Sequence, residues 1–139
     1  MNVKLKLDRN MRIIGSDAKG HETIFDTVPA VGGEDTASTP MVVMLEAMGT
    51  CSTMDILSIL RKKRKIIDAF EVEITGERRE KHPKIFIKTH LKYTLTSPDA
   101  TEADLQRSVE LSQEKYCGAS AMFKLAGCEV TYEVKVLKS

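Results

Sequence analysis

Residues 41–60 read MVVMLEAMGTCSTMDILSIL and are apolar on almost every side of a helix. Pro40 occupies a first-turn position before this stretch, and Thr39 can cap its start. The pattern is typical of a helix that is buried all round. The stretch is long enough to cross a bilayer. It contains Glu46 and Asp55, however, and a carboxylate near the centre of a membrane helix costs about 2.5–3.5 kcal/mol. We therefore predict a core helix and no membrane partner.

Residues that alternate between apolar and polar on both sides of this helix predict strands. The predicted strands are residues 1–8, 11–15, 23–28, 70–79, 84–96 and 128–137. Thr101 and Asp104 form a capping-box pattern that predicts a second helix running to Tyr116, and residues 120–126 predict a short third one. No linker or repeat divides the chain. Residues 1–139 are therefore predicted to form a single α+β domain.

The balance of charge excludes one class of partner. Lys and Arg number 21 and Asp and Glu number 20, which gives a net charge of +1 instead of the strong basic excess of a nucleic-acid-binding protein. The run RKKRK at residues 61–65 is interpreted as the solvated end of the long helix, where the helix dipole favours cations.

The size of the chain predicts a partner of another kind. Once its strands are assigned, a chain of 139 residues has little material left to surround a long apolar helix. We therefore expect a second copy to provide the missing cover in an obligate homodimer. The N-terminal residues show no secretion signal, and a chain with three cysteines and no such signal is expected to keep its thiols reduced in the cytoplasm.

Cys51 lies in the middle of the apolar helix. Its helical face is shared by a group of mainly apolar or sulfur-containing residues: Met44, Ala47, Met48, Met54, Asp55 and Ser58. One interpretation is that Cys51 packs as a small hydrophobic side chain. The alternative is a reactive thiol, which requires a nearby cation because burial alone raises the pKa of a thiol.

Cys117 precedes Gly118 at a predicted break between helical segments, where backbone N–H groups and the next helix dipole favour a thiolate. Cys51 and Cys117 are candidates for a redox pair, although their spacing does not show whether they meet. Cys128 lies in a predicted strand and is interpreted as structural. The histidines show no metal-ligand spacing, and no third ligand accompanies the two candidate thiols, so we predict no metal or cofactor.

Three segments in a fixed order resemble the OsmC/Ohr superfamily, the osmotically inducible protein C and organic hydroperoxide resistance proteins. The segments are TPMVVMLEAMGTCSTMDILSILRKKR, ELSQEKYCGASAM and CEVTYEVKV. SDAKGH and VGGE, nearer the N-terminus, extend the resemblance over nearly the whole chain, and the small OsmC-like branch is the most similar. The resemblance implies an intertwined homodimer in which antiparallel sheets wrap around buried central helices.

The resemblance also implies a cofactor-free thiol peroxidase in oxidative-stress defence. The residue matching Cys51 would attack an organic hydroperoxide as a thiolate and become a sulfenic acid. The residue matching Cys117 would then form a disulfide with it, which an external dithiol, lipoyl-type in the best-known branch, would reduce.

The sequence departs from the hydroperoxide resistance branch next to the helix-opening proline. That branch has a glutamate after the proline, which holds an arginine against the reactive thiol, whereas Met41 follows Pro40 here. Glu46 lies about 140° around the helix from Cys51. Arg9 and Arg12 are both candidates for the family arginine. A second hypothesis is therefore a non-catalytic dimer that binds a small apolar ligand or senses thiol oxidation.

Overall fold

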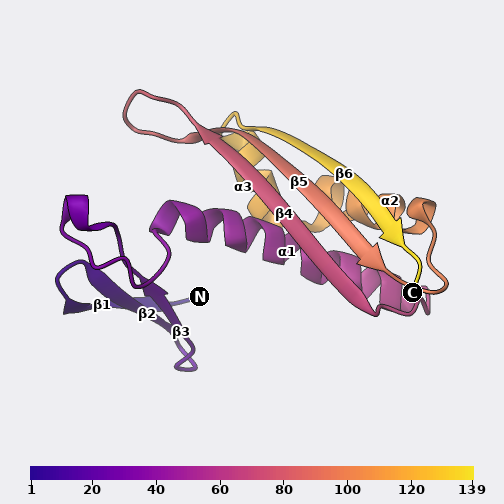
Figure 1. Cartoon of the computed structure of the whole chain (residues 1–139), viewed down its shortest axis with the longest axis horizontal. Coiled ribbons are helices and arrows are strands. Elements are labelled where there is room, and N and C mark those ends of the chain that lie inside the picture. The colour runs from indigo at the N-terminus through magenta and orange to yellow at the C-terminus, as the bar shows by residue number, and fades with distance from the viewer. The chain divides into compact units, whose positions relative to one another are not determined.

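Six strands and three α-helices are arranged in a computed structural model that describes residues 1–139 (Figure 1). The chain divides into two compact units, Met1–Met44 and Leu45–Ser139, which are described separately below. The N-terminal unit contains an antiparallel sheet, and the C-terminal unit contains a sheet covered by helices. The fold is therefore α+β, as the sequence predicted.

The N-terminal unit is a three-stranded meander in the order β1-β2-β3, with β1 at Val3–Arg9, β2 at Arg12–Asp17 and β3 at Glu22–Phe25. This confirms the predicted meander. The carboxylate of Asp17 accepts hydrogen bonds from the backbone N–H groups of Lys19 and His21, and so closes the turn between β2 and β3. The aliphatic side chains of β1 are exposed in the single chain.

Asp26 holds the loop between the meander and the long helix. Its side chain is almost wholly covered, and its carboxylate accepts hydrogen bonds from the backbone and hydroxyl of Thr36 and from the backbone of Thr27. In the same loop, a Cβ atom on Gly33 would lie 1.9 Å from the carbonyl oxygen of Thr27. Only glycine permits this close approach of two backbone segments.

Replacing Asp26 with asparagine is expected to lower thermal stability near neutral pH and to have a much smaller effect near pH 2. The hydroxyl of Thr36, followed by backbone N–H groups, lowers the pKa of Asp26 from 3.8 to about 2. A carboxyl whose pKa is lower in the folded state stabilises that state when ionised. Its contribution is complete above about pH 4 and is lost as the pH falls through about 2. Melting temperatures of both proteins across this range test the prediction, and a pH-independent difference would contradict it.

The C-terminal unit contains a second sheet, in the order β4-β5-β6, with β4 at Ala69–Arg78, β5 at Phe86–Thr96 and β6 at Glu129–Leu137. β4 and β5 form the predicted hairpin around His82-Pro83. β6 pairs with β5 in parallel, so this sheet is mixed rather than wholly antiparallel as the resemblance implied. The alternation of apolar and polar residues does not determine whether two strands pair in parallel. Here the long connection between β5 and β6 returns the chain to the end of the sheet where β5 began, so β6 runs in the same direction as β5.

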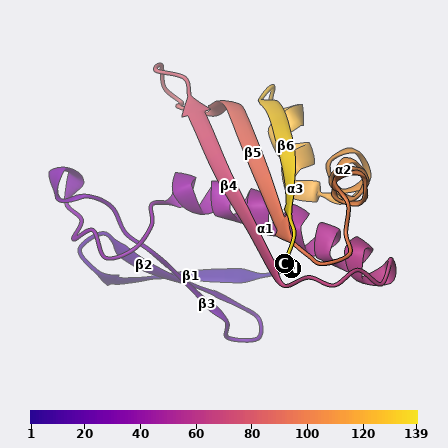
Figure 2. The same ribbon diagram turned by 45° about the vertical axis from the view of Figure 1, so that its right-hand side comes forward.

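Helices cover one face of this sheet, as the two views in Figures 1 and 2 show. These helices are α1 at Pro40–Lys62, α2 at Glu102–Leu111 and α3 at Gly118–Leu125. α1 approaches β4 closely at Gly49. A Cβ atom at this position would lie only 2.3 Å from the end of the Ile74 side chain, so the approach depends on glycine. The fully buried apolar residues between the layers are Met48, Ile56 and Leu60 of α1, Leu91, Tyr93 and Leu95 of β5, and Leu105 and Val109 of α2.

In the single chain, α1 is buried on one face instead of all round. Its buried residues are Met48, Gly49, Ser52, Ile56 and Leu60, whereas Met44 and Met54 are exposed. The chain alone does not cover the rest of its apolar surface. α1 is long and apolar enough to cross a membrane, but a single helix of this kind is weak support for a membrane span, because core helices meet the same criteria.

The connection between β5 and β6 contains a wide helical turn that the sequence did not predict. The capping box of Thr101 and Asp104 is confirmed at the start of α2. The helix was expected to continue to Tyr116, but α2 ends at Leu111 and is followed by a π-helical turn over Ser112–Tyr116. The backbone N–H of Cys117 donates to the carbonyl of Ser112 at 2.7 Å, and α3 begins directly afterwards. A π turn of this kind is often found at functional sites.

Candidate functional site

Cys51 and Cys117 are neighbours in the C-terminal unit. Cys51 is half-buried on α1, Cys117 is 2% exposed at the start of α3, and both are free thiols. The two thiols lie close enough that Cys51 contributes to raising the pKa of Cys117, although burial has the larger effect. The fold therefore brings together two thiols whose proximity could not be inferred from their spacing in the sequence.

The environment of Cys117 combines burial with one well-placed donor. The backbone N–H of Ser120 donates to the Cys117 sulfur at 3.3 Å, and this sulfur lies 4.0 Å from the carbonyl oxygen of Met48. The expected N–H group at the helical break is thus present. Burial has the larger effect, however, and raises the pKa of Cys117 above its ordinary value. The break thus supplies an N–H group that favours a thiolate, but burial outweighs it in the resting thiol, and the role of Cys117 stays a prediction.

A buried network of polar side chains lies beside the two thiols. Ser52 follows Cys51 and donates its hydroxyl to the carbonyl of Gly49 at 3.1 Å, so the phenol of Tyr93 donates to Ser52 at 2.7 Å. The side-chain amide of Gln113 donates to the same phenol oxygen at 2.9 Å. This network links α1, β5 and the π turn.

Sequence reasoning missed Tyr93 and Gln113. The available signal was that Tyr93 alternates onto the buried face of its strand, where a phenol needs a hydrogen-bond partner. Burial raises the pKa of Tyr93, so the phenol keeps its proton and its role as a donor at neutral pH. The sequence did not indicate that Gln113 is buried, because its side chain reaches the core only through the π turn.

Asp55 joins α1 to the segment that carries Cys117. The hydroxyl of Ser112 donates to the Asp55 carboxylate at 2.9 Å and lies 3.4 Å from the carbonyl oxygen of Ser52. Ser112 is also the residue whose carbonyl accepts the backbone N–H of Cys117. Asp55 therefore anchors the π turn one helical turn beyond Cys51, which answers the question of its partner that the sequence left open.

Each candidate arginine has a carboxylate partner within the N-terminal unit. Arg9 donates through Nε to Glu34 at 2.8 Å, and this hydrogen bond raises the pKa of Arg9. Arg12 donates through Nε to Asp8 at 3.0 Å and through Nη1 to the Thr36 hydroxyl at 2.7 Å. The choice between Arg9 and Arg12 as the family arginine stays a prediction, as does the role of Glu46.

Glu46 and Cys128, two further residues considered from the sequence, differ in their burial. Glu46 is exposed on α1. Cys128 is buried, with its sulfur 3.8 Å from the hydroxyl of Thr89. No group of three His, Cys, Asp or Glu residues in the structure could hold a metal ion.

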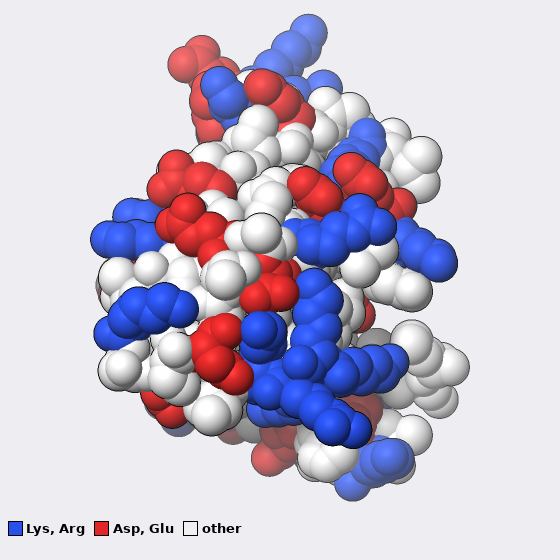
Figure 3. Space-filling view, turned by 90° about the vertical axis from the view of Figure 1, so that its right-hand side faces the viewer, with Lys and Arg blue, Asp and Glu red and all other residues white.

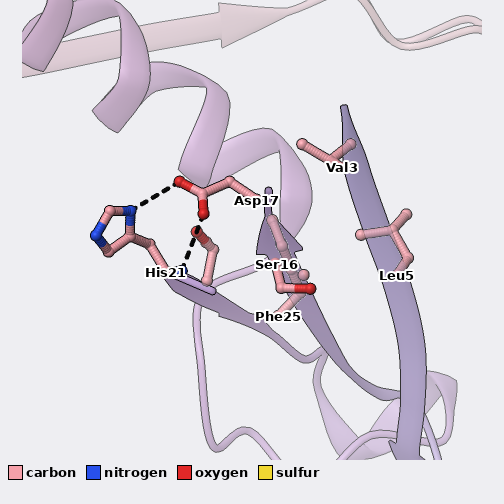
Figure 4. Close-up of a pocket in the computed structure, with 8 residues that line it drawn as sticks. Val3, Leu5, Ser16, Asp17, His21 and Phe25 are labelled. Carbon is pink, nitrogen blue, oxygen red and sulfur yellow. Dashed lines mark hydrogen bonds and ion pairs between the residues drawn. The ribbon is translucent and has the colours of Figure 1, made fainter. Parts of the chain in front are cut away.

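Two surface features lie apart from the thiols. The N-terminal unit has a pocket of about 240 Å³ between β1, β2 and the β2–β3 turn, where the ring of His21 pairs with Asp17 at 2.8 Å (Figure 4). Basic side chains gather at the end of the C-terminal unit where α1 terminates (Figure 3). Within this basic end, Lys63 and Lys65 pair with Asp104 at 3.7 and 3.4 Å.

The sequence pattern of the OsmC-like protein family matches residues 33–133, which include both thiols, the π turn and most of β6. The chain belongs to the OsmC-like protein family. This OsmC-like protein is 34% identical to Protein YhfA of Escherichia coli (strain K12) over 137 residues, which are 99% of this chain and 98% of YhfA.

Solved structures share the fold of this OsmC-like protein. A hypothetical protein from Aquifex aeolicus VF5 is 33% identical, with a TM-score of 0.81 over 98% of this chain and 96% of that one. The organic hydroperoxide resistance protein OsmC from Legionella pneumophila is 15% identical, with a TM-score of 0.70 over 97% and 96% of the two chains. At this low identity, the second comparison shows a common fold alone.

Proposed function

We propose that this OsmC-like protein is a thiol peroxidase that reduces organic hydroperoxides in oxidative-stress defence. The observation that carries the proposal is the proximity of Cys51 on α1 to Cys117 at the start of α3, close enough for the first thiol to raise the pKa of the second. Two adjacent free thiols, one of them half-exposed, are what a two-cysteine reduction cycle requires. The name of the Legionella pneumophila relative, an organic hydroperoxide resistance protein, supports this choice of substrate.

The reaction proceeds in two oxidative steps and one reductive step. The Cys51 thiolate attacks the terminal peroxide oxygen, so an S–O bond forms, the O–O bond breaks and the alkoxide takes a proton to leave as an alcohol. The sulfur of Cys117 then attacks the sulfenic acid of Cys51. An S–S bond forms, and the hydroxyl leaves as water with the proton of Cys117. An external dithiol reduces this disulfide by exchange and restores both thiols.

The working form of the protein is proposed to be a cytoplasmic homodimer. Met44 and Met54 of α1 are exposed in the single chain, although they share the helical face of Cys51. A second copy would cover this apolar surface and enclose the alkyl part of a hydroperoxide. In this arrangement Arg9 or Arg12 would supply the cation that favours the Cys51 thiolate.

Oxidation with one equivalent of cumene hydroperoxide tests the proposal. We expect the intact mass to fall by two hydrogen atoms and peptide mapping to find a disulfide between Cys51 and Cys117. The Cys128→Ser variant is the matched control, because the Cys128 sulfur packs against the Thr89 hydroxyl and the same disulfide should form. Oxidation that stops at a sulfenic or sulfinic acid, or that joins Cys128, would contradict the two-cysteine cycle.

One observation favours the second hypothesis, a dimer that senses thiol oxidation or binds a small apolar ligand. Burial raises the pKa of Cys117, and a protonated thiol closes a disulfide slowly. Such a protein would undergo one slow, stoichiometric oxidation in place of repeated turnover. Ligand binding that survives Cys51→Ser, in a protein without turnover, would favour this hypothesis over the peroxidase.

A further inference from the structure

Ser120 lies in the first turn of α3 with its side chain completely buried. Its backbone N–H donates to the Cys117 sulfur at 3.3 Å. Its hydroxyl makes no aligned hydrogen bond, a condition that it shares with one other buried side-chain oxygen, Oε1 of Gln113. A buried hydroxyl without a partner costs folding free energy, so its retention beside a reactive sulfur calls for an explanation.

The chemistry of sulfur provides that explanation. The Ser120 hydroxyl is close enough to the Cys117 sulfur to lower the pKa of this thiol, against the larger opposite effect of burial. A thiol is a weak acceptor, whereas hydrogen bonds to an ionised group are about twice as strong as neutral ones. The hydroxyl can rotate, since its proton is not fixed by another partner. It therefore has a strong acceptor only when Cys117 ionises.

We propose that Ser120 holds Cys117 as a thiolate while it closes the disulfide with Cys51, by donating both its backbone N–H and its hydroxyl to the sulfur. This inference rests on the proposed peroxidase cycle and identifies the residue that promotes its second step. In that step the thiolate forms the S–S bond with Cys51, the S–O bond breaks, and the proton released by Cys117 leaves with the hydroxyl as water. Ser120 donates hydrogen bonds throughout and keeps its own proton.

Two titratable groups interact with Cys117, namely Cys51 from α1 and Tyr93 from β5. Asp55 of α1 and Lys124 of α3 hold the π turn that precedes Cys117. Asp55 is bonded to the π turn, and the amine of Lys124 donates to the carbonyl of Gln113 at 2.7 Å. In a variant without the Cys51 thiol, the ionisation of Cys117 can therefore be measured without the influence of that neighbouring thiol.

The first test is a titration that needs no peroxide. In a Cys51→Ser, Cys128→Ser background, the ultraviolet absorbance of the thiolate is followed against pH, so Cys117 is the only thiol observed. Adding Ser120→Ala is expected to raise the apparent pKa of Cys117 by about one unit, which is about a tenfold smaller thiolate fraction below that pKa. Ser120→Thr keeps the hydroxyl and is expected to restore the titration. Ser108→Ala removes another buried hydroxyl, which donates to the carbonyl of Asp104, and is the control for folding.

The second test measures the two oxidative steps separately in the protein with all three cysteines. Rapid mixing with cumene hydroperoxide is expected to give the same rate of sulfenic acid formation in Ser120→Ala and wild type. Disulfide closure is expected to be about tenfold slower in the variant, following the thiolate fraction. The proposal is overturned if the Cys117 titration in Ser120→Ala matches that in Ser108→Ala, or if Ser120→Thr behaves like Ser120→Ala. A failure of peroxidase turnover alone leaves the titration result unchanged, so the two proposals fail separately.

Discussion

Replacing Cys51 with serine is expected to reduce the steady-state consumption of cumene hydroperoxide to the rate of the buffer. A hydroxyl has neither the acidity nor the nucleophilicity of a thiol, so the first oxygen transfer does not occur. Removing a nucleophile of this kind costs about three orders of magnitude or more in turnover. The measurement uses dithiothreitol or dihydrolipoamide as the reductant and compares cumene hydroperoxide with hydrogen peroxide. Wild type is expected to prefer the organic peroxide.

Two matched variants separate the roles of the other cysteines. Cys128→Ser is expected to keep full turnover, because Cys128 packs against Thr89 and is not part of the pair. Cys117→Ser is expected to reach the sulfenic acid once and then to lose activity through over-oxidation. Turnover that persists in Cys51→Ser, or that disappears in Cys128→Ser, would show that another thiol carries the reaction.

Replacing Leu91 with alanine is expected to lower the free energy of unfolding by about 2–5 kcal/mol. Leu91 is 0% exposed at the middle of the central strand, where it is paired with Ile74 of β4 and Tyr132 of β6. The change removes buried methyl groups and leaves a cavity between the sheet and the helices, which close-packed neighbours fill only in part. Urea unfolding at a fixed protein concentration measures the difference, since association contributes to apparent stability.

Ile87→Ala provides the control on the same strand. Ile87 is 39% exposed, so its truncation leaves no enclosed cavity and is expected to cost less than Leu91→Ala. Equal losses in the two variants would mean that the space around Leu91 collapses easily, or that the Ile87 side chain is covered in solution. Either result would contradict the packing described for β5.

Much of the fold could be predicted because its signals are local. Alternation gave the three strands of the meander and the hairpin, and the pattern of Thr101 and Asp104 gave the start of α2. The parallel pairing of β6 could not be predicted, because two helices separate β6 from its partner strand β5 in the sequence. The π turn was also missed, since its first residue, Ser112, is bonded to Asp55 on a helix that is distant in the sequence.

The candidate site was predictable residue by residue but not as an arrangement. Cys51 and Cys117 were candidates from their positions in the apolar helix and at the helical break, and the resemblance implied their roles, whereas their proximity depends on the packing of the π turn against α1. Ser120 and Gln113 have ordinary positions in an amphipathic sequence, and they become informative only because the fold buries them beside a thiol. Arg9 and Arg12 were equally plausible from the sequence, and each has its own carboxylate partner in the structure.

The parallel pairing of β5 and β6 has a consequence for protein synthesis. A parallel pair requires a crossover of a dozen or more residues, and here α2, the π turn and α3 form this crossover and carry Cys117. Ribosomes add about 5–20 residues per second, so a nascent chain exposes Cys51 for on the order of several seconds before Cys117 is made. β6, which completes the sheet, is the last strand to emerge. In the proposed cycle, the newly made helix therefore carries Cys51 as a lone thiol until the crossover with Cys117 has been made, and disulfide closure becomes available only when translation is nearly finished.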